Sequence, residues 1–406
     1  MNKPQVQAND LIDVAGVRVA AVASHVRYAN RLDLVLMELA PGSTSAGVFT
    51  QNAFCAAPVH VARAHLEQNQ GAVRYLLINT GNANAGTGKV GIDDALACCD
   101  ALAQEAGIAR HEILPFSTGV IGEKLPVHKI AAGIPSAIKS LGNDWLSAAK
   151  GIMTTDTCPK ARSLTLTIAG KPVVITGMSK GAGMIKPNMA TMLSFVFTDA
   201  KIDQATLHSL LQGAVDQSFN RITVDGDTST NDCCVLSATG QSGVELSNDN
   251  PQDLALFETE LKALVQELAK DIIRDAEGAN KFVTVDIKGG VTSKECLLVA
   301  YAISESPLVK TALSASDPNW GRILAAVGRA GIENLDVDKI DMYLGDVCIV
   351  TDGMLAPAYT EAQGQAQMQQ EQILITVDLN RGDARETVWT SDLSEEYVRI
   401  NASYRS

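Results

Sequence analysis

Segments with the hydrophobic pattern of strands alternate along this chain with segments that have the pattern of helices. Residues 74–79 (RYLLIN) form an apolar run that predicts a buried strand, and the spacing over 93–106 predicts the helix after it. Over 164–168, leucine and isoleucine alternate with threonine, and the Gly170-Lys171 turn follows, which predicts a hairpin whose second strand holds 173–175.

Helical spacing returns after the middle of the chain. Apolar residues from Leu207 to Phe219 predict one helix, and a longer helix is predicted from Pro251, with Asn250 as its N-cap, to a stop at Gly278. The mixture predicts an α+β chain, although periodicity alone does not separate a layered sandwich from a doubly wound fold. Further strands are predicted at 282–287, 373–379 and 386–390.

One segment joins a glycine-rich loop to a buried strand, with a single hydroxyl residue at the junction. Residues 180–200 read KGAGMIKPNMATMLSFVFTDA, and Thr191 stands where the apolar run begins. Glycine and proline could hold the Ala190–Thr191 bond in a strained geometry, so that Thr191 attacks the carbonyl before it and the chain is cut. The freed α-amine, with a pKa of about 7.7–8.0, could then act as base for the Thr191 hydroxyl. From the residues alone, a loop that enters a core strand stays an alternative.

This segment resembles the processing site of the ornithine acetyltransferase family, also called glutamate N-acetyltransferase, whose members cleave between the Ala and Thr of a KGxGMIxPNMATML-type motif. The resemblance extends over essentially the whole chain. It is carried by NTGNANAGTG from Asn79, FSTGVIGE from Phe116, GIMTTDT from Gly151, DGDTSTND from Asp225, DPNWGR from Asp317 and YVRINASY from Tyr397.

The resemblance implies a fold and a maturation step. The fold would be a layered helix/sheet/sheet/helix sandwich of the self-processing ornithine acetyltransferase type. Cleavage between Ala190 and Thr191 would divide the chain into an alpha chain, 1–190, and a beta chain, 191–406, which form one intertwined catalytic unit. By the family pattern, the assembly would be a heterotetramer with two copies of each chain.

The resemblance also assigns catalytic roles. Thr191 would be the nucleophile, and Thr118 with Gly119 would form an oxyanion hole, because a glycine-rich turn can aim backbone N–H groups and a hydroxyl at one point. Lys180 would bind a substrate carboxylate or assist proton transfer. The alternative for Thr118 and Gly119 is an ordinary turn, and the alternative for Lys180 is a solvated loop lysine. The substrate-binding residues that the resemblance implies are Thr154, Lys180, Thr191, Glu277, Asn401 and Ser406.

Two of these residues, Glu277 and Asn401, also carry an argument of their own. Glu277 is predicted at the carboxyl end of the long helix, where the macrodipole disfavours a negative charge by about 0.3–1 kcal/mol, so another group should favour it there. The resemblance implies that this group is a substrate ammonium or a proton, and one tolerated, exposed carboxylate is the alternative. Asn401 offers a donor and an acceptor, which suit a zwitterionic amino acid. By the resemblance, we expect threonine at the position of Ser406 in many relatives, and serine keeps the hydroxyl. A dispensable chain end is the alternative for both C-terminal residues.

The implied activity belongs to arginine biosynthesis. The enzyme would transfer the acetyl group of N2-acetylornithine to glutamate through an acetyl-threonine intermediate, giving ornithine and N-acetylglutamate without a cofactor. Acetyl-CoA is expected as a second acetyl donor, and a monofunctional enzyme that does not use it is the alternative. A self-processing aminopeptidase of related fold and a non-catalytic amino-acid-binding protein are the remaining alternatives.

Composition narrows the partners. The 406 residues carry a net charge of −13, which argues against a nucleic-acid partner, and no stretch approaches 18 consecutive apolar residues. The N-terminus lacks the apolar stretch of a secretory signal, so we expect a cytoplasmic protein with no membrane partner. Neither an HExxH motif nor a Cys/His cluster predicts a metal site. The sequence GMSKG from Gly177 fits GxSxG, but the only later histidine, His208, lies in a predicted helix, which disfavours a serine hydrolase.

Overall fold

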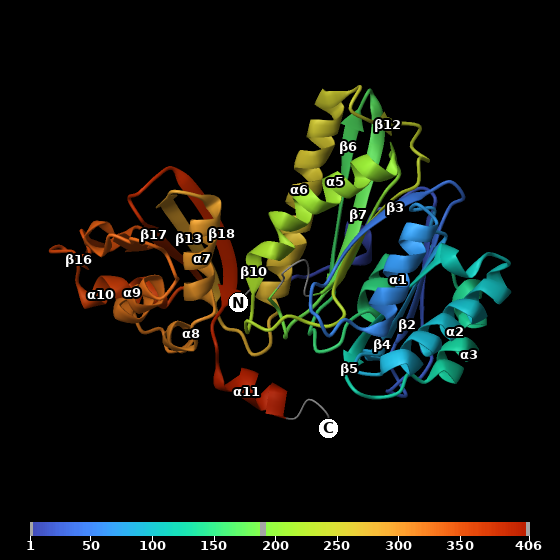
Figure 1. Ribbon diagram of the computed structural model, residues 1–406, viewed down its shortest axis with the longest axis horizontal. Coiled ribbons are helices and arrows are strands. Elements are labelled where there is room, and N and C mark those ends of the chain that lie inside the picture. The colour runs from blue at the N-terminus through green and yellow to red at the C-terminus, as the bar shows by residue number, and fades with distance from the viewer. Residues whose placement is uncertain (1–2, 187–191, 403–406) are drawn as a thin grey trace.

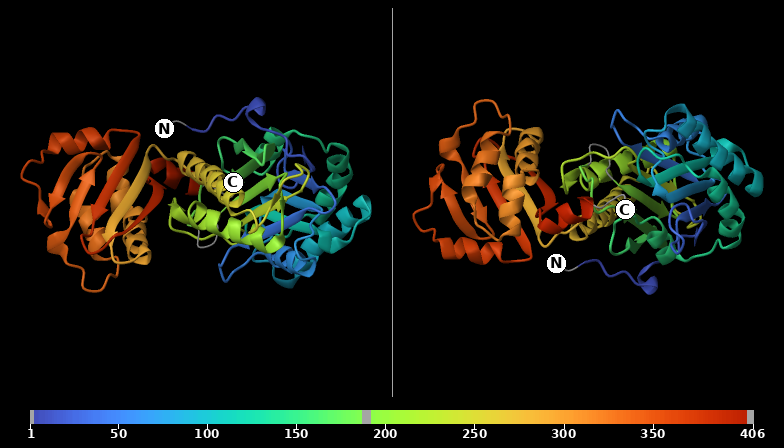
Figure 2. Two further views of the ribbon diagram at one scale, coloured as in Figure 1. Left: turned by 90° about the horizontal axis from the view of Figure 1, so that it is seen from above. Right: turned by 90° about the horizontal axis from the view of Figure 1, so that it is seen from below.

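The computed structural model describes residues 3–186 and 192–402, which form two lobes. The larger lobe holds two sheets and the helices on their outer faces, and the smaller lobe is built around one sheet near the C-terminus (Figure 1). Figure 2 shows the lobes side by side, with the last helix, α11 (Glu395–Ala402), at the junction between them.

The first sheet of the larger lobe has four strands in the order β1-β2-β4-β5, of which only β4 and β5 run parallel. Its outer face is covered by α2 and α3, through a core that includes Leu36, Leu77 and Ile113. The elements of this part are β1 (Val17–Val22), β2 (Leu34–Leu39), β4 (Tyr75–Asn82), β5 (Ile113–Val120), α1 (Ala57–Gln68), α2 (Gly88–Ala106), α3 (Val127–Lys139) and α4 (Trp145–Gly151).

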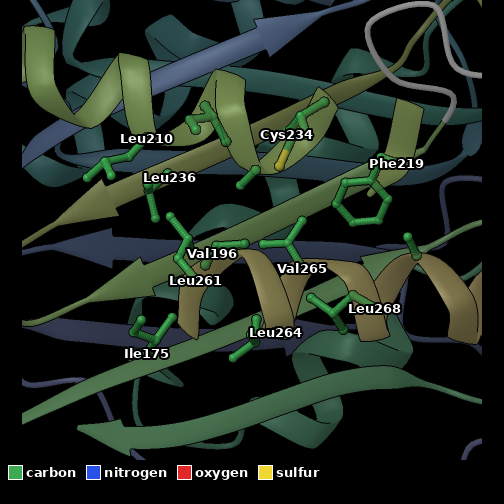
Figure 3. Packing of buried hydrophobic residues seen from close by; sticks show 14 of the residues in the cluster. Ile175, Val196, Leu210, Phe219, Cys234, Leu236, Leu261, Leu264, Val265 and Leu268 are labelled. Carbon is green, nitrogen blue, oxygen red and sulfur yellow. The ribbon is translucent and has the colours of Figure 1, made fainter. Parts of the chain in front are cut away.

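The second sheet has five strands in the order β3-β11-β8-β7-β6. Helices α5 and α6 lie on its outer face, where Leu264 and Leu268 of α6 pack against Val196 and the other apolar side chains of the sheet (Figure 3). The elements are β3 (Thr44–Phe49), β6 (Lys160–Ile168), β7 (Lys171–Lys180), β8 (Leu193–Thr198), β11 (Cys233–Ala238), α5 (Gln204–Asp216) and α6 (Pro251–Arg274), with the short pair β9 (Lys201–Ile202) and β12 (Glu245–Leu246) beside them.

The inner faces of the two sheets share one buried core. Phe116 of β5 and Phe195 of β8 meet edge to face, with ring centroids 5.1 Å apart, and Ile78 and Met178 belong to the same cluster. Side chains from two sheets therefore interdigitate between two helical layers, as in sheet-on-sheet packing. This arrangement confirms the predicted α+β helix/sheet/sheet/helix sandwich.

The smaller lobe contains a seven-stranded sheet in the order β10-β18-β13-β17-β14-β15-β16. Helix α7 packs on β13 and β18, and β10 joins the edge of this sheet from the larger lobe. The elements are β10 (Ile222–Thr223), β13 (Phe282–Gly290), β14 (Asp341–Leu344), β15 (Val347–Thr351), β16 (Met354–Leu355), β17 (Gln372–Asp378), β18 (Ala384–Ser391), α7 (Ser293–Ser304), α8 (Pro307–Ser314), α9 (Trp320–Gly328) and α10 (Glu361–Met368).

Most predicted elements form, but several boundaries differ. The hairpin predicted around Gly170 is β6 and β7, and the predicted strand at 74–79 is β4. The long helix begins at Pro251 as predicted, but it ends at Arg274 rather than at Gly278, and the Asn250 side chain makes no capping hydrogen bond. The helix predicted at 93–106 starts earlier, at Gly88, since glycine and lysine carry no apolar signal.

Strands from both sides of the Ala190–Thr191 bond are neighbours in one sheet. In the five-stranded sheet, β3, β7 and β6 come before this bond, whereas β11 and β8 come after it. Strand β8 pairs with β7 on one side and with β11 on the other. The segments before and after the bond are thus held together by the ladder of hydrogen bonds as well as by the chain.

Across residues 3–186 and 192–402, no single helix is long and apolar enough to cross a membrane. The bent pair α7 and α8 meets that criterion by length and composition only when the two helices are counted together.

Candidate active site

A cavity of about 270 Å³ lies where the ends of β5 and β7 meet the loops that follow them. Met192, which directly follows Thr191 in the sequence, is part of the wall. Ala190, Thr191 and Ser406 lie outside the described residues. The other residues that the sequence assigned to a site all line this cavity: Thr118, Gly119, Thr154, Lys180, Glu277 and Asn401.

Thr118 and Gly119 lie on the last residues of β5, not in a turn, so this part of the prediction was wrong. The glycine-rich composition reflects a close approach of two strands instead. Gly119 has φ +133°, and a Cβ atom there would lie 2.3 Å from the carbonyl carbon of Gly81 on β4. A side chain at this position would force the parallel strands apart, so glycine is required where the strand edge meets the cavity.

Lys180 ends β7 and reaches across to the other sheet. Its Nζ donates a hydrogen bond to Thr118 Oγ1 at 3.0 Å. Burial lowers the pKa of Lys180, although Asp156 and Asp232 act in the opposite direction. The ammonium group therefore gives up its proton more readily than a solvated lysine does.

Asp156 ties two walls of the cavity together, and sequence reasoning did not select it. Its Oδ1 accepts from the Gly181 N–H at 2.7 Å, and its Oδ2 accepts from the Thr154 N–H at 3.0 Å. Lys160 bridges Asp156 and Asp275, with 2.7 Å to each carboxylate, and all three side chains are fully buried. Burial raises the pKa of Asp156, but Lys160 and Lys180 outweigh burial and hold it below its ordinary value. Asp156 thus stays ionised and fixes the Thr154 loop.

Glu277 is buried at the cavity but does not lie at the end of a helix. Because α6 ends three residues earlier, at Arg274, the macrodipole argument for Glu277 was wrong. Its carboxylate accepts from Asn401 Nδ2 at 2.7 Å, and its backbone N–H donates to Ala182 O at 2.9 Å. A Cβ atom at Gly183 would lie 2.4 Å from Glu277 Oε2, so the glycine leaves the space that this carboxylate occupies.

The C-terminal helix α11 is held against the cavity, and this is why Asn401 reaches Glu277. The Tyr397 hydroxyl donates to Asp225 Oδ2 at 3.0 Å, and the two Asp225 oxygens also accept from the Met184 and Ile185 N–H groups. Burial raises the pKa of Tyr397 above its ordinary value, and Asp225 adds to this effect. The predicted approach of the chain end to the site is therefore seen for Asn401.

Two further wall residues come from the DGDTSTND segment, which the sequence marked without assigning a role. Asn231 Nδ2 donates to Ala83 O and to Ser117 O, the latter at 2.9 Å. Asp232 lies next to it in the wall. A run of Asp, Asn and Thr after the helical pattern of α5 was the available signal, but its role depends on strands that are distant in sequence.

The serine-hydrolase alternative lacks support in the described part of the chain. Ser179 of the GxSxG match is fully buried within β7, so no elbow exposes it. No group of three or more His, Cys, Asp or Glu side chains among residues 3–186 and 192–402 is arranged to hold a metal ion.

Comparison of the sequence with known proteins finds one matching family and curated relatives that share one name. The ArgJ family matches residues 18–406. The arginine biosynthesis bifunctional protein ArgJ of Pseudomonas syringae pv. tomato is 54% identical over 397 residues, covering 97% of each chain. The protein of the same name from Pseudomonas fluorescens is 53% identical over 395 residues, again covering 97% of each chain.

Two solved structures are similar to parts of the chain. The crystal structure of the arginine biosynthesis bifunctional protein ArgJ of Bacillus halodurans is 40% identical with a TM-score of 0.50, covering 53% of this chain and 100% of that one. The ornithine acetyltransferase of Mycobacterium tuberculosis, in complex with ornithine, is 34% identical with a TM-score of 0.41 and covers 46% of this chain and 98% of that one.

Proposed function

The chain belongs to the ArgJ family, and on that premise we propose how its cavity carries out acetyl transfer. The protein is an acetyltransferase of arginine biosynthesis. It transfers the acetyl group of N2-acetylornithine to glutamate, and it also acetylates glutamate from acetyl-CoA. A protein that only binds amino acids is disfavoured, because the described residues expected for catalysis line one cavity.

That convergence is the observation that carries the proposed chemistry. Six side chains or backbone groups from five separate segments, expected at a site from sequence alone, meet around about 270 Å³. Met192 lies in the same wall and directly follows Thr191 in the sequence. We therefore assign Thr191 as the nucleophile whose acetyl ester is the intermediate.

In the first half-reaction, Thr191 Oγ bonds to the acetyl carbonyl carbon and its proton passes to the α-amine of residue 191. The bond from that carbon to the N2 nitrogen then breaks, and the proton passes to this nitrogen as ornithine leaves. In the second half-reaction, the glutamate α-amine attacks the acetyl-threonine carbonyl and the threonine hydroxyl is restored. One amide replaces another, so the exchange requires neither ATP nor a cofactor.

Thr118 stabilises the oxyanion that forms in each half-reaction. Because Thr118 Oγ1 accepts from Lys180 Nζ, its own hydroxyl proton is left to donate to a negatively charged oxygen. Glu277, held by Asn401 Nδ2 at 2.7 Å, offers a carboxylate to the substrate ammonium group. Water must be kept out during this exchange, since it would otherwise hydrolyse the ester.

The α-amine base requires the chain to be cut before Thr191. The strand order supports this step, because β8 is paired on both sides and would stay in place after cleavage. The solved Bacillus halodurans chain is matched over its whole length and covers only 53% of this chain, so it has the size of a fragment of the full sequence. A heterotetramer with two copies of each fragment and a cytoplasmic location belong to the same proposal and rest on the family pattern.

Incubation of the purified protein with N2-acetylornithine, with and without glutamate, tests this function. Transfer predicts N-acetylglutamate and ornithine in equal amounts when glutamate is present, and at most one ornithine per enzyme when it is absent. Continuous release of acetate without glutamate would instead identify a hydrolase. Binding without any product would identify a non-catalytic protein. A parallel assay with acetyl-CoA and glutamate measures the second activity.

A further inference from the structure

A second cavity, of about 140 Å³, adjoins the first beyond the proposed oxyanion residues. The two cavities share Gly119, Val120, Thr154 and Thr155 in their walls, so they meet along the end of β5 and the Thr154 loop. The second cavity is completed by Arg27, Tyr28, Arg31, Gly81 and Ile400. No role for these residues follows from the chemistry described above.

The two cavities differ in charge. Lys180 in the wall of the first is accompanied by the carboxylates Asp232 and Glu277. Among the described residues, the wall of the second holds two arginines and no carboxylate. A group with a positive charge is therefore favoured in the first cavity, and a group with a negative charge in the second.

Both arginines are held in place by the protein. Arg31 Nη2 donates to the carbonyl of Thr154 at 3.0 Å and also to that of Met153, which fixes the guanidinium beside the shared wall. Arg27 Nη1 pairs with Glu123 Oε2 at 2.7 Å. A guanidinium carries five N–H donors, and these contacts use only part of that fork. The remaining donors suit a carboxylate, which an arginine can bind with two parallel hydrogen bonds.

The two amino acids that exchange the acetyl group differ in the same way as the cavities. In both, the α-amine is the group that carries or accepts the acetyl group. The ornithine side chain ends in an ammonium group, whereas the glutamate side chain ends in a carboxylate. We propose that Arg27 and Arg31 form the subsite for the side-chain carboxylate of the glutamate acceptor. This inference rests on the proposed acetyl transfer and adds the basis on which one site accepts two substrates of opposite side-chain charge.

The position of the subsite favours a short acid over the phosphates of acetyl-CoA. Gly119, next to the proposed oxyanion donor Thr118, is part of both cavities. The glutamate carboxylate is only a few bonds away from the reacting amine. The phosphates of acetyl-CoA are separated from the thioester by the whole pantetheine arm, so they would lie much farther from Gly119.

Steady-state kinetics of the Arg27→Gln variant tests the subsite. The loss of one charge-assisted hydrogen bond should raise KM for glutamate by about tenfold or more, and by several times more than KM for N2-acetylornithine. The preference for glutamate over glutamine as acceptor should fall by a similar factor, because glutamine keeps the shape and lacks the charge. Arg27→Lys should recover part of the loss. Arg110→Gln is the matched control, since Arg110 pairs with Asp100 at 3.2 Å on the outer helical layer.

Three results would overturn the proposal. An unchanged KM for glutamate would remove Arg27 from the site. Equal rises in KM for both amino acids would assign Arg27 to the α-carboxylate that both share, or to the fold, and not to the glutamate side chain. A rise confined to acetyl-CoA, measured with saturating glutamate, would assign the cavity to a phosphate. The wild-type protein is measured first: if it releases no ornithine from N2-acetylornithine, the proposed function fails, independently of Arg27.

Discussion

Lys180 Nζ and Thr118 Oγ1, 3.0 Å apart, join the two sheets of the larger lobe at the edge where both strands end. Lys180 belongs to β7 in the five-stranded sheet and Thr118 to β5 in the four-stranded sheet. Because the lysine is the donor, the threonine hydroxyl keeps its own proton for a third group. This single contact therefore makes the Thr118 hydroxyl a hydrogen-bond donor towards that group.

Replacing Thr118 by alanine removes that donor. We expect kcat to fall by about 10²–10³, the usual cost of one oxyanion donor, while the melting temperature changes little. Thr118→Ser should keep most of the activity. Thr165→Ala, at an exposed position of β6, is a matched control that should leave kcat unchanged. A variant that melts earlier but turns over normally when folded would make Thr118 structural.

The cleavage proposal predicts two fragments. Mass spectrometry of the purified protein should give residues 1–190 and 191–406, with Thr191 as a free N-terminus. Thr191→Ala should stay intact and inactive, because it has no hydroxyl to attack the preceding carbonyl, whereas Thr191→Ser should still cleave. Wild-type protein that is intact and fully active would contradict the mechanism.

Removal of residues 401–406 should raise KM for N2-acetylornithine and glutamate sharply and leave self-cleavage largely intact. The reason is that Asn401 orients the Glu277 carboxylate, whereas the fold does not depend on the chain end. Ser406→Thr should be nearly silent. Val398→Ala, on an exposed face of α11, serves as the control. Unchanged kinetics after truncation would exclude Asn401 and Ser406 from the site.

Lys160→Met should destabilise the fold strongly. It would leave Asp156 and Asp275 buried without their cation, a situation that costs roughly 3–5 kcal/mol in other proteins. Chemical denaturation measures the change in the free energy of unfolding. Lys201→Met, which breaks the exposed pair with Glu245, should change it by only about 0.5 kcal/mol or less. Equal effects of both substitutions would mean that the buried triad contributes no more than a surface pair.

Stability should also fall in acid for a reason that can be traced to the same triad. The pKa of Asp156 is below its ordinary value in the folded protein, so the unfolded chain takes up a proton first as the pH falls. The contribution of Asp156 is therefore complete above about pH 4 and is lost as the pH falls through the lower, folded value. Thermal unfolding between about pH 2 and pH 5 should show this loss, and Lys160→Met should reduce it. An identical acid dependence in that variant would contradict the assignment.

Local pattern was enough to predict much of the larger lobe. The hairpin of β6 and β7 follows from alternation and a glycine turn, and the start of α6 follows from Pro251. The order of strands could not be obtained in this way, because β3, β11 and β8 are neighbours in the sheet and far apart in the sequence.

The candidate site was predicted where a motif marked it and missed where only the fold creates it. Thr118, Lys180 and Glu277 were selected from their segments, although the reasons given for Thr118 and Glu277 needed correction. Asp156 was not selected, since its role depends on the ion pair with Lys160 and on the hydrogen bond from the Gly181 amide. The arginine cavity was missed for the same reason: Arg27 and Arg31 face Gly119 only once β4 and β5 are paired.

The alternation of strands around the Ala190–Thr191 bond has a consequence for biosynthesis. Strand β8 gains its neighbours β7 and β11 only when segments far apart in the sequence have assembled. If the bond is strained by that assembly, an unfolded precursor has nothing to drive its own scission. The free amine at Thr191 would then be present only in molecules that have already folded. The number of active centres in a preparation would equal the number of chains that folded and were cleaved.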